Sequence, residues 1–375
     1  MTPRESALSA LDYGAWDELP VAHFGFWRET LENWVAEGRL RPYEIEGIRD
    51  GSPVSTLIGK KLGFDFNWGD CFPLASGLFP AFPEKVLRVR DDGTEEVRNA
   101  DGAIVLRRPG ATGIPAEIGH ALVDRASWEA EFLPRLAFSE SRIDAALLAS
   151  MPLPADRAGP LGLYCGSLYG IIRNWLGIEG LAYLTADDPE LYREIIDTVG
   201  GLVLACVRAL LARRSDFDCM SFWEDICFKN GPLVVPSQFR ELVGPWYRKV
   251  CAEASATGIR FRYVDCDGVI ADLVPTWLEN GVNVMFPVEY GTWRGSLADL
   301  RARFGRELRG VGGMDKSVFS KDRPTIDAEI ERLRPIVDLG GYLPCPDHQI
   351  PPDAEWDLVR YYCDRFRETF RRRWR

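Results

Sequence analysis

The feature that most constrains the fold is a regular alternation of short apolar runs and amphipathic helical segments, which begins near residue 160. Six apolar runs are each followed by a segment with helical spacing of its apolar residues, at residues 161–166, 218–225, 259–268, 283–289, 308–315 and 341–347. Alternating strands and helices build a parallel sheet. Residues 20–25 and 52–59 provide two further candidate strands. Eight strand–helix units close into a (β/α)8 TIM barrel, and this α/β fold is our prediction.

An open, doubly wound α/β sheet is the alternative architecture. It is less favoured because no Gly-x-Gly-x-x-Gly fingerprint opens any of the predicted helices. We expect one domain over residues 1–375, with an N-terminal extension and a helix within residues 27–40. Residues 85–108 alternate in polarity and contain two Asp-Gly pairs, which predicts a small antiparallel β meander that decorates the domain.

Composition excludes several classes of protein. The net charge of −11 disfavours a nucleic-acid partner. The longest apolar-rich stretch, at residues 200–211, is too short to cross a bilayer, and the N-terminus shows no signal peptide, so no membrane partner is expected. Nine cysteines are spread singly, which is typical of reduced thiols. The sequence therefore predicts a cytoplasmic globular protein that acts on a small molecule.

Acidic residues follow five of the six predicted strands. They are Glu224 and Asp225, Asp265 and Asp267, Glu289, Asp315, and Asp347 beside His348. In a TIM barrel the carboxyl ends of the strands form the active site, so we expect one shared pocket. In an extended segment, residues 265 and 267 point to the same face, and both carboxylates can reach one point.

These two carboxylates allow two interpretations. With Glu289 and His348 they make an oxygen-rich set with one imidazole, which suits Zn²⁺, Fe²⁺ or Mn²⁺. Alternatively, Asp265 and Asp267 accept backbone N–H groups at a tight turn before Gly268.

Other residues near the strand ends complete the predicted site. His348 and His23 are candidate bases or ligands, although His348 can also be an ordinary loop histidine. Cys266 alternates with the two aspartates and should point away from them. His23 and three aromatic residues are predicted to line the substrate site: Trp27, Tyr164 and Trp223. Such aromatic residues suit a planar or apolar substrate.

Several motifs carry a family resemblance. They are VDCDG with PTWLENGVNVMFPVEY, FGRELRGVGGMDK, GGYLPCPDHQIPPD, the opening WDELPVAHFGFW, and CGSLYGIIRNWLGIEGLAYLTADDPEL. With them the chain resembles the uroporphyrinogen decarboxylase superfamily over essentially its whole length, and especially the branch of corrinoid-dependent methyltransferases. The resemblance implies a (β/α)8 barrel with an N-terminal extension. It also places two zinc-ligand positions of that branch on Asp265 and Asp267, and a third on or beside His348, so a bound metal would have carboxylate and imidazole ligands instead of thiolates.

The sequence departs from the heme-pathway decarboxylases of that superfamily. Their arginine-rich N-terminal motif is replaced here by HFGFWRETLENW, in which Arg28 is the single arginine. A substrate with many carboxylates needs such cations. We therefore do not expect this chain to decarboxylate uroporphyrinogen.

Three hypotheses about function follow. The first is a methyltransferase that moves a methyl group between a small molecule, such as a methoxylated aromatic, and a corrinoid on a partner protein. The chain has no cobalamin-binding Asp-x-His-x-x-Gly motif of its own, and its acids and His348 would hold a metal or polarise the leaving oxygen. The second is a metal-free decarboxylase that uses Asp225 or Asp265 as acid and His348 as base, with Glu224 as a further catalytic candidate. The third is a barrel that only binds a ligand.

Overall fold

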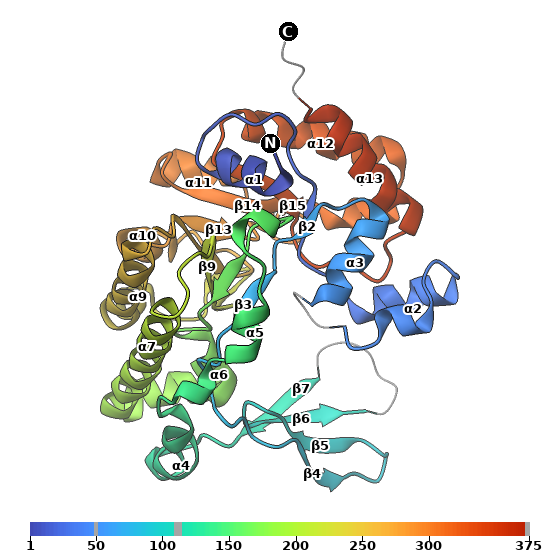
Figure 1. Cartoon of the computed structure of the whole chain (residues 1–375). Coiled ribbons are helices and arrows are strands. Elements are labelled where there is room, and N and C mark those ends of the chain that lie inside the picture. The colour runs from blue at the N-terminus through green and yellow to red at the C-terminus, as the bar shows by residue number, and fades with distance from the viewer. Residues whose placement is uncertain (49–51, 109–114, 372–375) are drawn as a thin grey trace.

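A parallel sheet of seven strands forms the centre of the molecule (Figure 1). The computed structural model describes residues 1–48, 52–108 and 115–371. Across the sheet the strands are β15 (Tyr342–Pro346), β14 (Arg309–Met314), β13 (Val284–Phe286), β12 (Phe261–Asp265), β9 (Cys219–Trp223), β8 (Gly162–Tyr164) and β3 (Cys71–Pro73). All neighbouring pairs are parallel, so all carboxyl ends lie at one edge. The predicted alternating α/β architecture is confirmed.

The ring of strands is not closed by hydrogen bonds. The strands β1 (Ala22–His23) and β2 (Phe66–Asn67) form a separate parallel pair, and β1 contacts β15. Within the described ranges, no strand ladder joins β15 to this pair or this pair to β3. The structure therefore has the order of a TIM-like barrel, but the predicted closed eight-stranded ladder is not observed.

One predicted strand is a helix. Residues 52–59 were expected to form a strand, but α3 spans Pro53–Leu62. Ser52 caps this helix, Pro53 occupies its first turn, and its buried residues Ser55, Ile58 and Leu62 recur at helical spacing. The short strands β2 and β3, which replace the expected one, contain only two and three residues and leave little pattern in the sequence.

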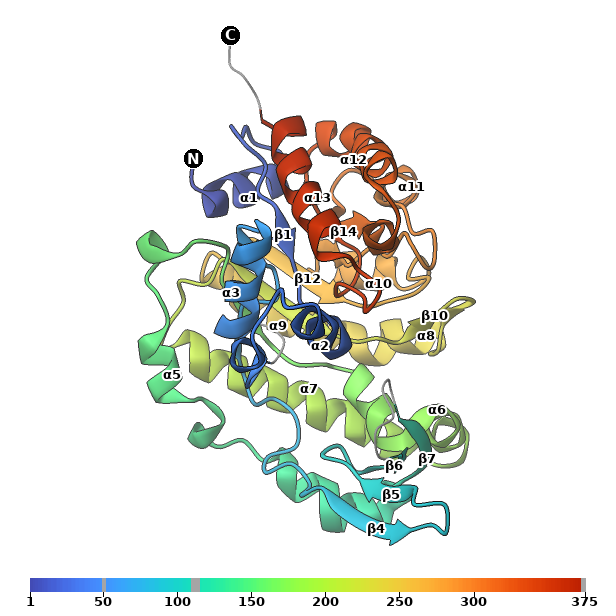
Figure 2. The same cartoon turned by 90° about the vertical axis from the view of Figure 1, so that its right-hand side faces the viewer.

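Helices surround the strands (Figure 2). The principal ones are α1 (Pro3–Leu11), α2 (Arg28–Ala36), α6 (Gly170–Asp187), α7 (Pro189–Leu211), α9 (Gly244–Ala256), α10 (Val274–Glu279), α11 (Leu297–Phe304), α12 (Arg323–Asp338) and α13 (Trp356–Thr369). Further helices are α4 (Arg125–Ser127), α5 (Ala145–Ser150) and α8 (Pro236–Gln238). Each central strand from β8 onwards is followed by at least one helix, as the sequence pattern predicts.

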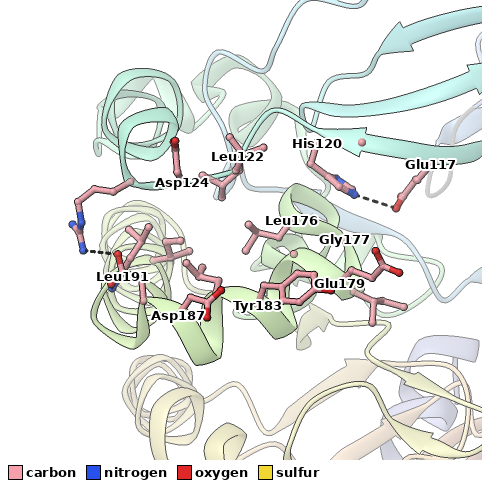
Figure 3. A pocket seen from close by; sticks show the side chains of 18 of the residues that line it. Glu117, His120, Leu122, Asp124, Leu176, Gly177, Glu179, Tyr183, Asp187 and Leu191 are labelled. Atoms are coloured by element: carbon pink, nitrogen blue, oxygen red, sulfur yellow. Dashed lines mark hydrogen bonds and ion pairs between the residues drawn. The ribbon is translucent and has the colours of Figure 1, made fainter.

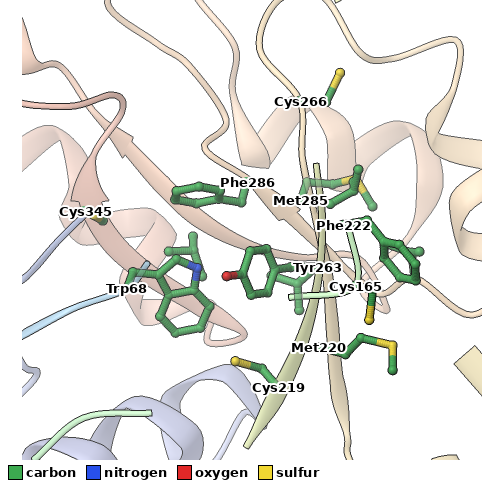
Figure 4. Packing of buried hydrophobic residues seen from close by; sticks show 14 of the residues in the cluster. Trp68, Cys165, Cys219, Met220, Phe222, Tyr263, Cys266, Met285, Phe286 and Cys345 are labelled. Atoms are coloured by element: carbon green, nitrogen blue, oxygen red, sulfur yellow. The ribbon is translucent and has the colours of Figure 1, made fainter. Parts of the chain in front are cut away.

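Aromatic side chains fill the space inside the strands (Figure 4). The Tyr263 ring lies 5.4 Å from that of Trp68 and 5.7 Å from that of Phe286, measured between centroids. Alternation along β12 turns Tyr263 and Asp265 to this inner side and Cys266 to the other side. Cys266 is buried away from the two aspartates, as predicted.

The predicted meander is present and has four strands. These are β4 (Lys85–Val89), β5 (Glu95–Arg98), β6 (Ala103–Arg107) and β7 (Ala116–His120), paired antiparallel in chain order. The fourth strand lies outside the expected range of 85–108. The meander lies to one side of the central sheet, next to α6 (Figure 2).

We expect the N-terminal part to be inseparable from the rest. It supplies β3, which pairs with β8, and the Ala10 carbonyl of α1 accepts a hydrogen bond of 2.8 Å from the Gly341 amide. Removing residues 1–159 would expose the edge of β8 and the core. A fragment of residues 160–375 should therefore lack a cooperative thermal transition by circular dichroism. A sharp transition in that fragment would contradict a single folding unit.

Candidate active site

A cavity of about 630 Å³ opens at the carboxyl ends of the strands. The last residues of five strands line it: Pro73, Tyr164, Trp223, Asp265 and Phe286. Seven of its lining residues are aromatic: Phe24, Trp27, Tyr164, Phe222, Trp223, Tyr263 and Phe286. The polar lining includes Asp225, Asp267, His348 and Gln349. Its volume is in the range of small-ligand sites.

Asp267 and His348 face each other in this cavity. Their closest atoms, Asp267 Oδ2 and His348 Nε2, are 3.6 Å apart. Burial, together with the nearby carboxylates of Glu289 and Asp225, raises the pKa of Asp267 to about 8. Burial and the positive charge of Lys316 lower the pKa of His348 to about 4. At neutral pH the pair is therefore a protonated carboxyl group beside a neutral imidazole.

Two aromatic rings hold His348 in place. Trp27 stacks on the imidazole with a centroid distance of 5.7 Å and an interplanar angle of 20°. Phe24 meets the same imidazole edge-on, also at 5.7 Å. The Asp267 Oδ1 atom is buried and has no hydrogen-bond partner in the part of the chain that the structure describes. A buried polar atom without a partner next to a cavity is well placed to bind a polar atom of a ligand.

The other two acids of the cavity differ in their surroundings. Asp265 is the last residue of β12. The pKa of Tyr164 is raised, mainly because Tyr164 is buried and also because the negative charge of Asp265 is near. Asp225 has a left-handed backbone, with φ at 42°, and its Oδ2 lies 3.3 Å from a guanidinium nitrogen of Arg173 on α6. Four of the residues predicted from the strand ends therefore line one cavity: Asp225, Asp265, Asp267 and His348.

Glu289 lies outside the cavity lining. Its Oε1 atom is 3.2 Å from Lys316 Nζ, which also lies 3.5 Å from Asp347 Oδ1. Asp347 further accepts hydrogen bonds from the amides of Tyr290 and Gly291. Nothing in the sequence around Lys316 indicates that it pairs with two buried acids.

The expected metal ligands do not form a metal site. Among the described residues, no group of three or more His, Cys, Asp or Glu side chains is arranged to hold a metal ion. Glu289, which was expected as a ligand, is instead bound to the ammonium group of Lys316. As the described side chains are placed, they do not form a donor set for Zn²⁺, Fe²⁺ or Mn²⁺.

Glu224 stabilises the fold and does not line the cavity. Its carboxylate is fully buried and accepts hydrogen bonds from the amides of Leu168, Tyr169 and Gly170 at 2.7–3.0 Å. The hydroxyl groups of Ser167 and Tyr247 donate to it as well. This arrangement anchors the N-terminus of α6, where the helix dipole favours a negative charge. The catalytic role considered for Glu224 is not supported by its position.

His23 is also a core residue. It is buried, its ring packs against Phe26 and Phe64 at 4.9 and 4.8 Å, and Gly59 of α3 approaches its Nε2 atom so closely that a Cβ there would lie at 2.2 Å. Burial lowers its pKa to about 3, so it is neutral at neutral pH. Sequence pattern alone does not show that this strand residue faces a helix and not the cavity.

The comparisons with known proteins support the fold. No protein-family model matches the chain, and a search of curated proteins found no match. A solved structure of a methyltransferase from Methanosarcina mazei is similar over 99% of both chains, with a TM-score of 0.60 and 15% identity. A putative vitamin-B12-independent methionine synthase from Listeria monocytogenes aligns over 94% of this chain and 98% of its own, with 13% identity and a TM-score of 0.42. The first similarity shows that the fold is shared.

Within the described ranges, no helix has both the length and the apolar composition needed to cross a membrane.

Proposed function

We propose that this chain is a methyltransferase that removes a methyl group from an uncharged methoxylated aromatic compound. The observation that carries the proposal is the character of the cavity. It has seven aromatic residues, a carboxyl group that is protonated at neutral pH, and, among the described residues that line it, no lysine or arginine. Aromatic walls suit a planar ring, and the carboxyl group of Asp267 supplies a proton donor.

The charges of the cavity favour an uncharged substrate. A carboxylate on the substrate would lie near Asp225 and Asp265, and none of the described lining residues is a lysine or arginine that could balance its charge. This argues against uroporphyrinogen, and it equally weakens the decarboxylase hypothesis, because every substrate of a decarboxylase carries a carboxylate.

Demethylation of an aryl methyl ether needs a proton at the leaving oxygen. The methyl C–O bond breaks, its electron pair stays on the oxygen, and Asp267 donates its proton to that oxygen as the bond breaks. The electron pair of the new bond comes from a nucleophile of the methyl acceptor. The neutral imidazole of His348 lies 3.6 Å from the Asp267 carboxyl group, close to the proton that is transferred.

The acceptor in this proposal is a corrinoid carried by a partner protein. A corrinoid supplies a strongly nucleophilic metal centre when it is bound. The sequence has no cobalamin-binding motif, and a cavity of about 630 Å³ is too small to enclose a whole corrinoid together with an aromatic substrate. The acceptor would therefore approach at the mouth of the cavity.

A binding experiment tests the substrate class. Isothermal titration calorimetry should show that 2-methoxyphenol binds at least about tenfold more tightly than 4-hydroxy-3-methoxybenzoate, which adds one carboxylate to the same ring. A Gln349→Arg variant, which places a cation in the lining, should reduce or reverse this preference. Tighter binding of the benzoate to the wild-type protein would contradict the proposal.

The rate of methyl transfer should fall at high pH. Asp267 donates a proton, so the active form is the protonated acid, which predominates below its pKa of about 8. Above that pH, the single-turnover rate constant should decrease about tenfold per pH unit. At the acid end, His348 gains a proton as the pH falls through about 4. Stopped-flow measurements over this range check the profile, and a rate that rises through pH 8 would show that Asp267 acts as a base.

A further inference from the structure

A second and larger concave surface lies between the meander and α6 (Figure 3). This groove has a volume of about 940 Å³. One wall is formed by β7 and the loop after it, with His120 and Leu122, and the other by α6, with Gly177 and Tyr183. The proposed methyl-transfer chemistry does not use the groove.

The groove gathers exposed apolar side chains. Four large apolar residues with exposed fractions between 45 and 71% line it: Ile118, Val123, Ile178 and Tyr183. Single exposed apolar residues are ordinary on a protein surface, whereas several in one concavity mark a binding surface. Deeper in the groove lie Leu122, Leu176 and Leu191, which are nearly or fully buried.

The rim of the groove is acidic. Its lining includes Glu117, Asp124, Glu179, Asp187 and Asp188. Among the described residues of this lining, Arg125 is the one arginine, and there is no lysine. Arg125 is already paired, at 2.9 Å from Glu194 and 3.6 Å from Asp188. The groove therefore offers apolar contacts flanked by negative charge.

The shape of the groove is fixed by a kink in α6. Gly177 has a φ of 67°, and a Cβ at this position would lie 2.4 Å from His120 Nε2 on β7. Only glycine adopts this conformation readily and allows this close approach. The two walls of the groove therefore meet at a backbone position where any side chain would be strained and would displace His120.

The groove is also connected to the proposed active site. Arg173, one turn before the kink, binds the cavity residue Asp225 at 3.3 Å. The neighbouring Asn174 donates a hydrogen bond of 3.3 Å to Asp101 in the meander. Hence α6 lines the groove and also carries the arginine that pairs with Asp225 of the cavity.

We propose that the groove docks a helix of a partner protein, one that presents a row of apolar side chains flanked by lysine and arginine. Charge complementarity with the acidic rim selects a basic partner, and the exposed apolar residues supply the buried contact. We identify this partner with the carrier of the methyl acceptor, and that identification rests on the proposed function.

A defined peptide tests the docking surface. The probe is a helical peptide of about 18 residues with leucine along one face and lysine beside it, and the control peptide has glutamate in place of lysine. Binding is measured by fluorescence anisotropy to the full chain and to a Val123→Lys/Ile178→Lys variant. The matched control is a Leu57→Lys/Leu339→Lys variant, which carries the same added charge at exposed positions outside the groove.

The groove variant should bind the lysine peptide at least about tenfold more weakly than wild type, and the control variant should stay within about threefold. The glutamate peptide should bind weakly to all three proteins. Equal losses in the two variants would overturn the proposal, because the peptide would then respond to net charge alone. Dimerisation of the wild-type chain that is lost only in the groove variant would also overturn it, by making a second copy the occupant.

Activity measurements separate this inference from the proposed function. With a small free corrinoid as acceptor, the groove variant should transfer methyl groups at the wild-type rate, because docking is not needed. Absence of transfer from every methoxylated aromatic, in wild type and variant alike, would refute the proposed function and the identity of the partner. The peptide experiment would still decide whether the groove binds a basic helix.

Discussion

Replacing Asp267 with asparagine should lower the rate constant of methyl transfer by about 10²–10⁴-fold, the usual contribution of a general acid. Asparagine keeps the size of the protonated carboxyl group and can still donate a hydrogen bond, but it cannot transfer a proton. The loss should be smaller for 4-nitroanisole, whose leaving group is more acidic and needs less protonation. Single-turnover kinetics with both substrates provide the measurement.

Two controls show whether this loss is chemical. Cys266→Ser, at the adjacent residue that points away from the cavity, should leave the rate within about threefold of wild type. Asp267→Asn should also be at least as stable as wild type at pH 8. The pKa of Asp267 is about 8 in the folded protein and about 4 when unfolded, so the wild-type protein loses stability as the pH rises from about 4 to 8. The asparagine variant avoids that loss. An equal loss of rate with both substrates, or an unfolded variant, would contradict the assignment.

Replacing Glu224 with alanine should destabilise the fold by about 3–5 kcal/mol. The change leaves three backbone amides at the start of α6 and the hydroxyl groups of Ser167 and Tyr247 without their buried acceptor. Because typical domains are stable by about 5–15 kcal/mol, much of the total would be lost. Urea unfolding monitored by tryptophan fluorescence measures the effect.

The matched control is Glu331→Ala, at an exposed carboxylate that pairs with Arg334 on α12. Exposed pairs of this kind contribute about 0–1 kcal/mol, so this variant should unfold almost like wild type. A stable but inactive Glu224→Ala protein would show instead that Glu224 takes part in the chemistry.

The strands that contain a clear run of apolar residues were predicted from the sequence, whereas the very short strands β2 and β3 were not. From β8 to β15, each run of apolar residues followed by a helical segment became a strand of the central sheet. The misassigned segment, 52–59, has a proline and a serine cap that favour a helix. Over such a short length, its apolar residues fit the spacing of a helix and the spacing of a strand equally well. The two-residue strand β2 is fixed by tertiary pairing with β1, which leaves no local signal.

The candidate site was predicted only where strand geometry determines the direction of a side chain. Asp265 and Asp267 share a face because they are two residues apart, and His348 comes just after β15, the last strand of the central sheet. Glu224, Glu289 and His23 follow the same strand-end rule. The structure nevertheless places Glu224 against a helix terminus, Glu289 against the half-buried Lys316, and His23 against a helix. Whether a strand-end residue faces the cavity or its supporting shell depends on the packing of distant segments, which the local sequence does not reveal.

The most direct test of the proposed function is product analysis in a single turnover. The protein is mixed with 2-methoxyphenol and a free reduced corrinoid under anaerobic conditions, and benzene-1,2-diol and methylated corrinoid are quantified. The proposal predicts equal amounts of both products with wild type, and little of either with Asp267→Asn. Failure to form the diol from any uncharged methoxylated aromatic between about pH 6 and 8, with release of carbon dioxide from a carboxylated substrate instead, would contradict it.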